Sequence, residues 1–285
     1  GVMKLDQKEI ERVQRYFTSP EYDDNASDDT SFNELEKSDK GFSNWTKRNL
    51  FAHRVPGYKA VVVSLKAPGI APGDATDEQM DHIASLADLY SYGEVVVTHD
   101  QNLILPNVKQ ANLFALWKKL SKKNLATANI GLLTDMICCP GLDFCSLANA
   151  GSIPIAKQIN EKFDDIDYLH DIGELKIKMS GCMNACGHHH VGHIGILGVK
   201  KKDKEFYQLT LGGSAEKDAC LGDRLGPSIV KEEVANVIGK LLSVYVEKRQ
   251  DEERFLDTYR RVGIEPFKER VYPKTPAKEK AHANN

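Results

Sequence analysis

The sequence of 285 residues lacks any run of about 18 apolar residues, the length that a membrane-spanning helix needs. It also lacks a basic excess, since 38 Lys and Arg residues stand against 41 Asp and Glu residues. The first absence predicts no membrane span. The second argues against a general nucleic-acid-binding protein, because such proteins usually carry a strong basic excess. The opening residues hold no apolar signal core, so we expect a cytoplasmic protein.

Length and composition predict a folded protein. Hydrophobic residues make up 41% of the chain and charged residues 28%, as in ordinary globular domains. The length allows one large domain or two ordinary ones with a real core. We find no tandem repeat along the chain, so a solenoid is not expected.

The N-terminal part of the chain predicts a polar segment followed by a patterned unit. We expect residues 1–44 to form a short amphipathic helix (5–17) and an acidic linker (18–44). Residues 45–125 then predict a β-α-β-β-α unit. Its expected elements are a strand at 58–66, a helix opened by a Thr76–Gln79 capping box, strands at 94–99 and 102–106, and a helix opened by Asn107 and Gln110.

The second unit is expected over residues 126–271, followed by a polar tail at 272–285. Alternating apolar residues around a Lys-Lys-Asp-Lys turn predict a hairpin at 193–213. Three helices and one strand complete the unit, with the strand at 174–180 and the helices at 153–163, 228–249 and 252–263. The fold class predicted for the whole chain is α+β.

Five of the six cysteines gather in two short segments. Cys139 and Cys145 are separated by five residues, Cys182 and Cys186 by three, and Cys138 adjoins the first pair. In a chain without a signal peptide such bunching favours metal binding or catalysis over disulfides. Four thiolates are what a cubane 4Fe–4S cluster needs, one for each iron.

Two other interpretations of the cysteines stay open. Free cysteines can be buried as small apolar side chains, and four thiolates can hold a structural zinc ion. Zinc pairs mostly use spacings of two to four residues, so the gap between Cys139 and Cys145 fits zinc poorly. We expect Gly181 and Gly187 to let the backbone approach a bulky inorganic centre. The spacing of Cys182 and Cys186 places both sulfurs on one side if that turn is helical.

The two cysteine segments resemble the C-x5-C and C-x3-C signatures of the sirohaem-dependent nitrite and sulfite reductases. The matching stretches are ICCPGLDFCSLANA at 137–150 and MSGCMNACGHHHVGHIGILG at 179–198. Upstream, the phrases GDATDEQM and THDQNLILP resemble the ferredoxin-like half-domain of that family. The resemblance extends over about residues 45–272, and the likeness is to the bacterial sulfite reductase-like group. It implies a ferredoxin-like half-domain followed by a mixed α/β domain for a 4Fe–4S cluster and sirohaem.

The resemblance also implies a function and a ligand set. By position, Cys139, Cys145 and Cys182 would hold cluster iron, and Cys186 would join the cluster to the sirohaem iron. The reaction would be the six-electron reduction of sulfite to sulfide in sulfur assimilation, with nitrite reduction as the second choice. A small oxyanion would be the substrate, and a separate protein would donate electrons. The alternative is a cluster-binding or zinc-binding module without catalysis.

A run of histidines follows the second cysteine pair. Imidazole titrates near neutral pH, so His188, His189 and His190 are candidate catalytic proton donors. They could equally line a haem edge or bind the backbone. The lysines from Lys200 to Lys204 predict a solvated hairpin turn, or else a docking patch for an acidic electron donor.

This sequence departs from the family pattern in length. Family members are usually about twice as long and built as two similar halves, and this chain resembles the second half only. The resemblance therefore implies a missing N-terminal half, which carries most of the basic side chains that bind substrate. Related sequences often have an arginine near position 96, where this chain reads Glu-Val-Val-Val-Thr over residues 94–98.

Overall fold

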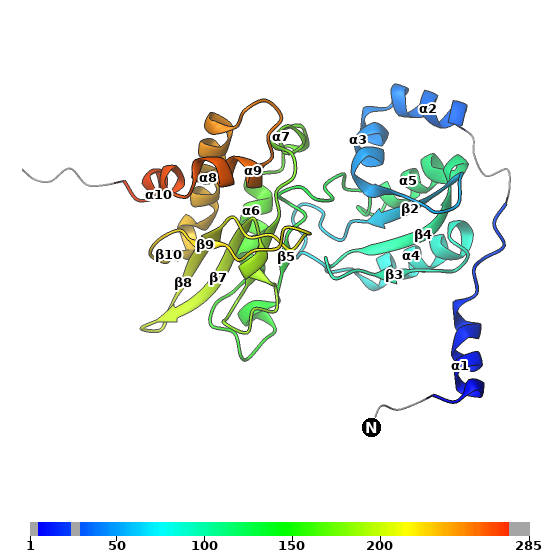
Figure 1. Cartoon of the computed structure of the whole chain (residues 1–285), viewed down its shortest axis with the longest axis horizontal. Coiled ribbons are helices and arrows are strands. Elements are labelled where there is room, and N and C mark those ends of the chain that lie inside the picture. The colour runs from blue at the N-terminus through cyan, green and yellow to red at the C-terminus, as the bar shows by residue number, and fades with distance from the viewer. Residues whose placement is uncertain (1–4, 24–28, 274–285) are drawn as a thin grey trace, which may run out of the picture.

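Four antiparallel strands form the sheet of the N-terminal lobe in the computed structural model, which describes residues 5–23 and 29–273. Their order in the sheet is β1-β2-β4-β3 (Figure 1). The strands are β1 (Leu50–Ala52), β2 (Tyr58–Val63), β3 (Val96–Val97) and β4 (Leu103–Lys109). Two helices complete the predicted unit, α4 (Asp77–Tyr90) and α5 (Leu113–Ser121). The β-α-β-β-α order and the Thr76–Gln79 capping box are confirmed.

The predicted linker at 18–44 is wrong for most of its described length. Helices α2 (Asp29–Ser38) and α3 (Lys40–Asn49) occupy it, while residues 24–28 lie outside the described residues. Asp39 caps α3, because its carboxylate accepts a hydrogen bond from the backbone of Phe42 at 3.0 Å. Phe42 and Trp45 are fully buried in the core of this lobe. A helix can therefore be amphipathic with only two large apolar residues, although its segment is polar in overall composition.

The predicted cap at Asn107 is also wrong. Asn107 lies inside β4, where its side chain donates to Glu94 Oε2 at 2.6 Å and its backbone N–H donates to Ser91 Oγ at 3.1 Å. A short 3-10 turn at Gln110–Asn112 leads into α5 instead. The expected strand at 94–99 shortens to the two residues of β3.

The second lobe is built on a mixed sheet in which β6 lies between β5 and β7. Pairing is parallel from β5 to β7 and antiparallel from β7 to β8, and β9 and β10 both pair with β8. The strands are β5 (Ile137–Cys138), β6 (Ile177–Ser180), β7 (Ile194–Lys201), β8 (Lys204–Leu211), β9 (Asp223–Arg224) and β10 (Ile229–Val230). The predicted hairpin is confirmed. Lys202 and Asp203 both have positive φ, as the tight turn between β7 and β8 requires.

Helices cover the second sheet and complete its core (Figure 1). The predicted helix at 228–249 begins only with Val234, because Ile229 and Val230 pair with β8. The sequence analysis missed α7 and α10. Within the described residues of this lobe, the α-helices are α6 (Ile153–Lys162), α7 (Ile166–Ile172), α8 (Val234–Lys248), α9 (Phe255–Val262) and α10 (Glu265–Val271).

The two ends of the chain differ. Helix α1 (Gln7–Gln14) forms where predicted and projects away from both lobes (Figure 1). Most of the predicted tail, residues 274–285, lies outside the described residues. Among the helices that the structure describes, none is both long and apolar enough to cross a membrane.

Candidate functional site

Both cysteine pairs lie on loops that leave the same end of two neighbouring parallel strands. Cys139 directly follows β5, and Cys182 follows β6 after a single glycine. The Cys139 N–H donates to Met179 O at 3.1 Å, and the N–H groups of Asn149 and Ala150 donate to Gly181 O at 2.9 and 3.1 Å. Backbone hydrogen bonds therefore hold the two loops against each other.

The loops also meet through a sulfur. The Gly181 N–H donates to Cys139 Sγ at 3.0 Å. Backbone amides that donate to ligand sulfurs are among the groups that tune a metal centre. Within the first loop, the Cys145 N–H donates to Gly141 O at 2.9 Å, which closes a turn between the two cysteines of that pair.

The four thiols are free, and their exposure differs. Cys182 is buried, Cys139 and Cys145 are half-buried, and Cys186 is exposed. The segment between Cys182 and Cys186 is a succession of turns, so the helical arrangement considered for this pair does not occur. Ala185 within this segment has φ of 56°, a left-handed conformation that a continuous helix excludes.

The residues present fit a four-thiolate cluster in their chemistry, and both cysteine pairs lie on loops that are in contact. Four free thiols lie on two loops that touch, and one of them already accepts an amide hydrogen bond. A 4Fe–4S cluster takes one thiolate on each of four irons, so its ligands surround a volume. Among residues 5–23 and 29–273, no group of three or more His, Cys, Asp or Glu side chains is placed to hold a metal ion.

Gly181 and Gly187 lie where other backbone segments approach closely, so neither position has room for a side chain. A Cβ on Gly187 would lie 1.8 Å from Met179 O, and one on Gly181 would lie 2.7 Å from Ala150 O. No side chain fits at either distance. The structure therefore gives these glycines a role in packing the second loop against β6 and the first loop.

The other two cysteines have different surroundings. Cys138 is 3% exposed and belongs to the core, and its burial raises the pKa of the thiol. Its Sγ donates to Cys139 O at 3.2 Å. Cys220 lies on a separate segment, where its Sγ donates to Gly212 O at 3.3 Å.

The three candidate histidines differ in exposure. His188 and His190 are exposed, whereas His189 is 1% exposed. Neither ring nitrogen of His189 has a hydrogen-bond partner among the described residues. Burial, with the neighbouring charge of His190, lowers the pKa of His189 to about 4, so its imidazole is neutral at pH 7.

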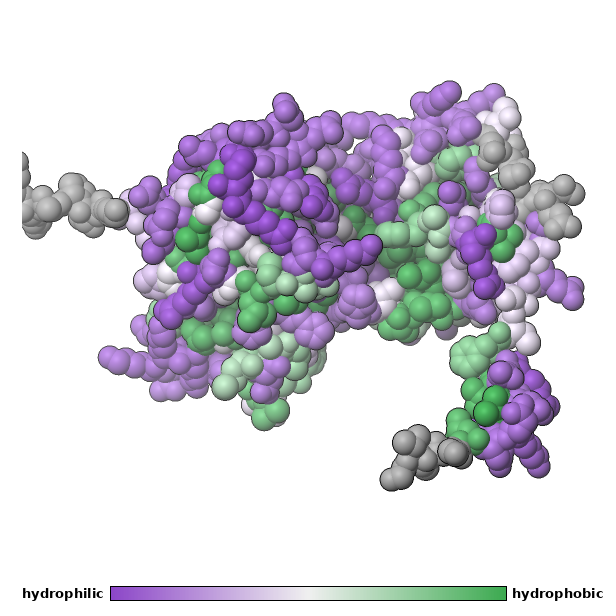
Figure 2. Space-filling model, viewed as in Figure 1, coloured by the Kyte–Doolittle hydropathy of each residue, from purple (hydrophilic) through white to green (hydrophobic). Residues whose placement is uncertain are grey.

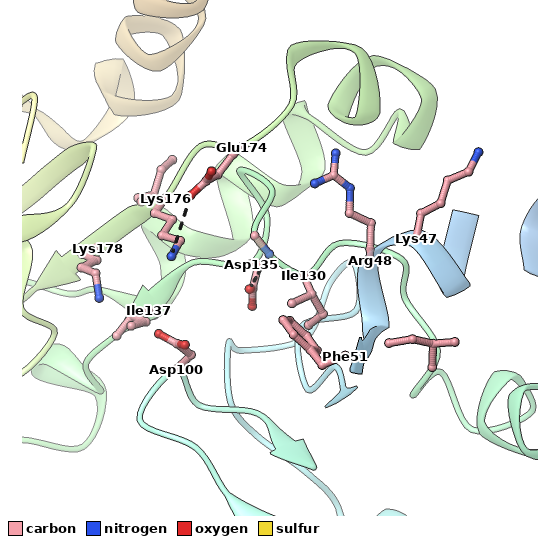
Figure 3. Close-up of a pocket in the computed structure, with 13 residues that line it drawn as sticks. Lys47, Arg48, Phe51, Asp100, Ile130, Asp135, Ile137, Glu174, Lys176 and Lys178 are labelled. Carbon is pink, nitrogen blue, oxygen red and sulfur yellow. Dashed lines mark hydrogen bonds and ion pairs between the residues drawn. The ribbon is translucent and has the colours of Figure 1, made fainter. Parts of the chain in front are cut away.

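A cleft of about 400 Å³ lies between the two lobes, lined by residues of both. Sequence reasoning missed it. Lys176 and Lys178 project into it from alternate positions of one segment, with Asp100 of the N-terminal lobe facing them (Figure 3). The pattern Glu-Leu-Lys-Ile-Lys at 174–178 was the available signal, since alternate residues of a strand face opposite sides.

The charges in the cleft are only partly paired. Lys176 Nζ lies 2.5 Å from Glu216 Oε1 and 3.9 Å from Glu174 Oε1. Lys178 is 4% exposed, and its burial lowers the pKa of the amine. Arg48, from α3, lines the opposite wall, where burial likewise lowers the pKa of its guanidinium. The cleft thus carries basic side chains from both lobes.

Large apolar side chains stand exposed on the cysteine loops. Phe144 and Met183 are each 81% exposed, Leu147 is 70% exposed and Leu142 is 47% exposed. Figure 2 shows hydrophobic residues gathered at the lower rim of the lobe that carries these loops. A contiguous exposed apolar patch commonly marks an interaction surface.

Comparisons with known proteins identify both lobes. Residues 132–280 match the family described as nitrite and sulphite reductase 4Fe-4S domain. Residues 55–123 match the nitrite/sulfite reductase ferredoxin-like half domain. The first match alone covers more than half of the chain.

Curated relatives carry both kinds of name. A ferredoxin–nitrite reductase of Synechococcus elongatus is 28% identical over 206 residues, which are 70% of this chain and 39% of that protein. The haemoprotein beta-component of an NADPH sulfite reductase of Bacillus pumilus is 28% identical over 193 residues, 65% of this chain and 32% of that protein. The chain therefore spans well under half the length of these relatives.

Solved structures share the fold. The NirA protein of Mycobacterium tuberculosis matches 77% of this chain and 41% of its own, with a TM-score of 0.60 and 22% identity. Dissimilatory sulfite reductase I matches 80% of this chain and 72% of its own, with a TM-score of 0.65 and 15% identity. With its ferredoxin-like lobe and its paired cysteine loops, this chain belongs to the nitrite and sulphite reductase 4Fe-4S domain family.

Proposed function

We propose that Cys139, Cys145, Cys182 and Cys186 hold one 4Fe–4S cluster, and that the chain is the C-terminal half of an enzyme that reduces sulfite to sulfide. The observation that carries the proposal is the pairing of the two cysteine loops at the ends of β5 and β6. All four thiols are free, and both loops belong to a domain whose family is named for this cluster.

Exposure supports different roles for the four cysteines. Cys139, Cys145 and Cys182 are buried or half-buried, as suits ligands to the cluster alone. Cys186 is exposed, so it is the ligand that a second cofactor could reach. We assign to it the thiolate shared between the cluster and the iron of sirohaem. When bound, sirohaem supplies an iron centre that can take up an oxyanion and pass electrons to it.

The cleft supports an anionic substrate. Lys178 and Arg48 line the cleft with basic side chains, and a cation attracts an oxyanion more strongly in a site of low dielectric constant than in water. Strand β6 connects the cleft to the second cysteine loop, because Lys178 lines the cleft and Ser180 Oγ, two residues later, accepts from the Gly187 N–H at 3.1 Å. The rest of the substrate site would come from the other half of the enzyme.

Reduction of sulfite consumes protons, and the histidines are the side chains that could supply them. His188 and His190 are exposed and can exchange protons with water. His189 packs against His190, with ring centroids 3.9 Å apart, and has no exposed nitrogen. We therefore assign proton uptake to His188 and His190, and to His189 the support of their loop.

The exposed side chains on the cysteine loops support a partner on this face. Phe144 and Met183 would be covered by the N-terminal half, which the curated relatives have room for in the remainder of their length. A separate electron-donor protein would then deliver electrons to the assembled enzyme.

Nitrite is the second candidate substrate. Curated relatives of similar identity are named as nitrite reductases and as a sulfite reductase haemoprotein, and both substrates are small oxyanions. Steady-state reduction with an artificial donor, measured for sulfite and for nitrite on the chain extended by its upstream sequence, distinguishes them. A larger kcat/KM for nitrite would reverse the assignment.

The test of the cluster is chemical. Protein reconstituted anaerobically with iron and sulfide should contain about four irons and four sulfides per chain, the stoichiometry of a cubane. Its spectrum should show a broad visible band, to which bound sirohaem adds sharp bands. Stoichiometric zinc without iron would mean a zinc-binding module. Iron and sulfide without any uptake of sirohaem would mean a cluster carrier without catalysis.

A further inference from the structure

Gln101 has a backbone conformation that its residue type rarely adopts. It lies in the loop between β3 and β4 of the ferredoxin-like lobe, with φ of 58°. The left-handed region is sterically unfavourable for a non-glycine residue, because its Cβ crowds the neighbouring carbonyl oxygen. Such a conformation persists only where the surroundings enforce it, and it is common at functional sites.

The surroundings of Gln101 are tight. A Cβ on Gly73 would lie 2.9 Å from Gln101 Cβ, so the side chain of Gln101 occupies the space that any larger residue at position 73 would need. This packing holds the Gln101 side chain in one direction, toward the second lobe.

The amide of Gln101 meets both backbone groups of one residue. Gln101 Nε2 donates to Cys138 O at 2.9 Å, and Gln101 Oε1 accepts from the Cys138 N–H at 2.9 Å. An amide side chain can donate and accept at once, whereas a carboxylate can only accept and an aliphatic side chain can do neither. β5 is the edge strand of its sheet, so the amide of Gln101 stands where a further strand would pair with Cys138.

The neighbours of Gln101 are fixed as well. Asp100 O accepts a hydrogen bond from Lys66 Nζ, and Asn102 Nδ2 donates to Asp135 Oδ1 at 3.0 Å. Hydrogen bonds therefore hold three consecutive residues of the loop where the two lobes meet. They fix the backbone that carries the Gln101 side chain.

We infer that Gln101 is a positioning residue for Cys139, acting across the lobe interface on the strand from which the first cysteine loop begins. The inference rests on the proposed role of Cys139 as a cluster ligand. Cys138 is fixed by Gln101 on one edge, while the Cys139 N–H is fixed by Met179 O on the other. Together these contacts set the position at which Cys139 Sγ accepts from the Gly181 N–H. The ferredoxin-like lobe thereby controls how firmly the cluster is held.

The variants separate this role from general stability. Gln101→Leu keeps the approximate size and removes both hydrogen bonds, whereas Gln101→Glu keeps only an acceptor. Gln79→Leu is the matched control, because the Gln79 side chain in the same lobe also donates to a backbone carbonyl, that of Lys123, at 2.8 Å. Circular dichroism establishes that each variant folds.

The first measurement needs no cofactor. In cluster-free full chain, alkylation by iodoacetamide is followed at each cysteine by peptide mass spectrometry. Loss of two partly buried hydrogen bonds should speed alkylation of Cys139 by about tenfold in Gln101→Leu. The rate at the already exposed Cys186 should stay unchanged, and Gln79→Leu should match the wild type at both positions. Gln101→Glu should fall between the two, and it replaces Gln101→Leu if that variant does not fold.

The second measurement uses reconstituted protein. Iron loss to a chelator should be about tenfold faster in Gln101→Leu than in the wild type, by the same loss of hydrogen bonding. The electron paramagnetic resonance signal of the reduced cluster should shift in Gln101→Leu and not in Gln79→Leu. A purely structural effect would not move that signal.

The outcomes are distinguishable. If Gln101→Leu and Gln79→Leu give equal alkylation of Cys139 and equal iron loss, the positioning role is overturned and the cluster assignment stands. If the wild type takes up zinc and no iron while Gln101→Leu still exposes Cys139, the cluster assignment fails and the coupling between the lobes stands. Equal behaviour of Gln101→Glu and the wild type would also overturn the two-point contact.

Discussion

Lys66 and Asp135 form an ion pair where the two lobes meet, with Lys66 Nζ 2.7 Å from Asp135 Oδ1 and side chains 0% and 9% exposed. The same carboxylate accepts from Asn102 Nδ2 at 3.0 Å and, through Oδ2, from the Gly131 N–H at 2.9 Å. A buried lysine thus has one carboxylate partner, and that partner is itself held by both lobes.

Replacement of Lys66 by methionine should strongly destabilise the chain. It removes one partner of a buried ion pair and leaves the Asp135 carboxylate without a counter-charge, at a cost of about 3–5 kcal/mol. Urea unfolding followed by circular dichroism measures this loss. The matched control is Lys59→Met, which removes a lysine from β2 in the same lobe, where Lys59 is only half-buried.

A double variant separates charge from packing. Lys66→Met with Asp135→Asn removes both charges and keeps a side-chain oxygen for the Asn102 and Gly131 donors, so it should recover part of the stability lost in the single variant. A single Lys66→Met variant as stable as Lys59→Met would contradict the importance of the pair.

Substitution of the cysteines should divide them into two groups. Cys145→Ser and Cys182→Ser should lose the cluster and, after reconstitution, much of the stability that metal binding adds. Cys220→Ser should bind iron as the wild type does, because Cys220 Sγ contacts Gly212 O on a separate segment. Iron analysis and thermal unfolding of the reconstituted variants measure both effects. Equal loss of iron from Cys220→Ser and Cys182→Ser would refute the ligand assignment.

Acid should weaken the fold through His193. Burial lowers its pKa to about 4 from the ordinary 6.5, and its Nδ1 accepts from the Lys176 N–H at 3.2 Å, which requires an unprotonated nitrogen. The unfolded chain binds a proton at His193 with a pKa of 6.5, whereas the folded chain does so only near pH 4. The free energy of unfolding is therefore highest above pH 6.5 and falls as the pH drops from 6.5 toward 4. The expected loss of unfolding free energy is about 3 kcal/mol, from the free energy of each pKa unit.

Cluster-free protein serves to measure this dependence, since acid also attacks iron–sulfur clusters. Urea unfolding should show a shallower decline with acid in His193→Gln than in the wild type. His190→Gln, at an exposed position nearby, should decline as the wild type does. Parallel curves for all three proteins would exclude His193 as the cause.

The chain alone should reduce sulfite poorly, even with cluster and sirohaem supplied. A doubly charged anion must leave water to reach a haem iron, which takes several fixed cations, and the cleft offers few that lack an acidic neighbour. Steady-state reduction by this chain should fall far below that of a version extended by its upstream sequence. Equal turnover would show that the cations of residues 1–285 suffice. Sedimentation of the short chain should show self-association, because Phe144 and Met183 remain uncovered.

The sequence predicted correctly those turns and helix caps that depend only on residues close together in the chain. The turn at Lys202 and Asp203 needed only short-range chemistry, and the Thr76–Gln79 capping box joined residues three apart. Helix α3 was missed because its buried apolar side chains are only two, Phe42 and Trp45. These side chains stabilise the helix by packing against a core formed by later residues. Tertiary packing decided what composition suggested wrongly.

The candidate site divides in the same way. The cysteine spacings alone indicated a metal site, and the family resemblance implied a 4Fe–4S cluster. Asn107 misled because asparagine is a good helix cap when exposed, whereas here Ser91 and Glu94 satisfy its polar groups inside a sheet. The contact of Gln101 with Cys138 joins positions 37 apart and depends on a positive φ, which no pattern of neighbouring residues announces.

The placement of β6 has a consequence for biosynthesis. The second cysteine loop leaves β6, and β6 acquires both of its neighbours only when β7 has formed. During translation the first cysteine loop emerges before β6, and β7, the strand on the far side of β6, emerges later still. The two cysteine loops can therefore meet only after about 40 further residues have been made and β6 has paired with β5. If the four thiols hold the proposed cluster, its iron and sulfide would reach them after this pairing, from the side where Cys186 is exposed.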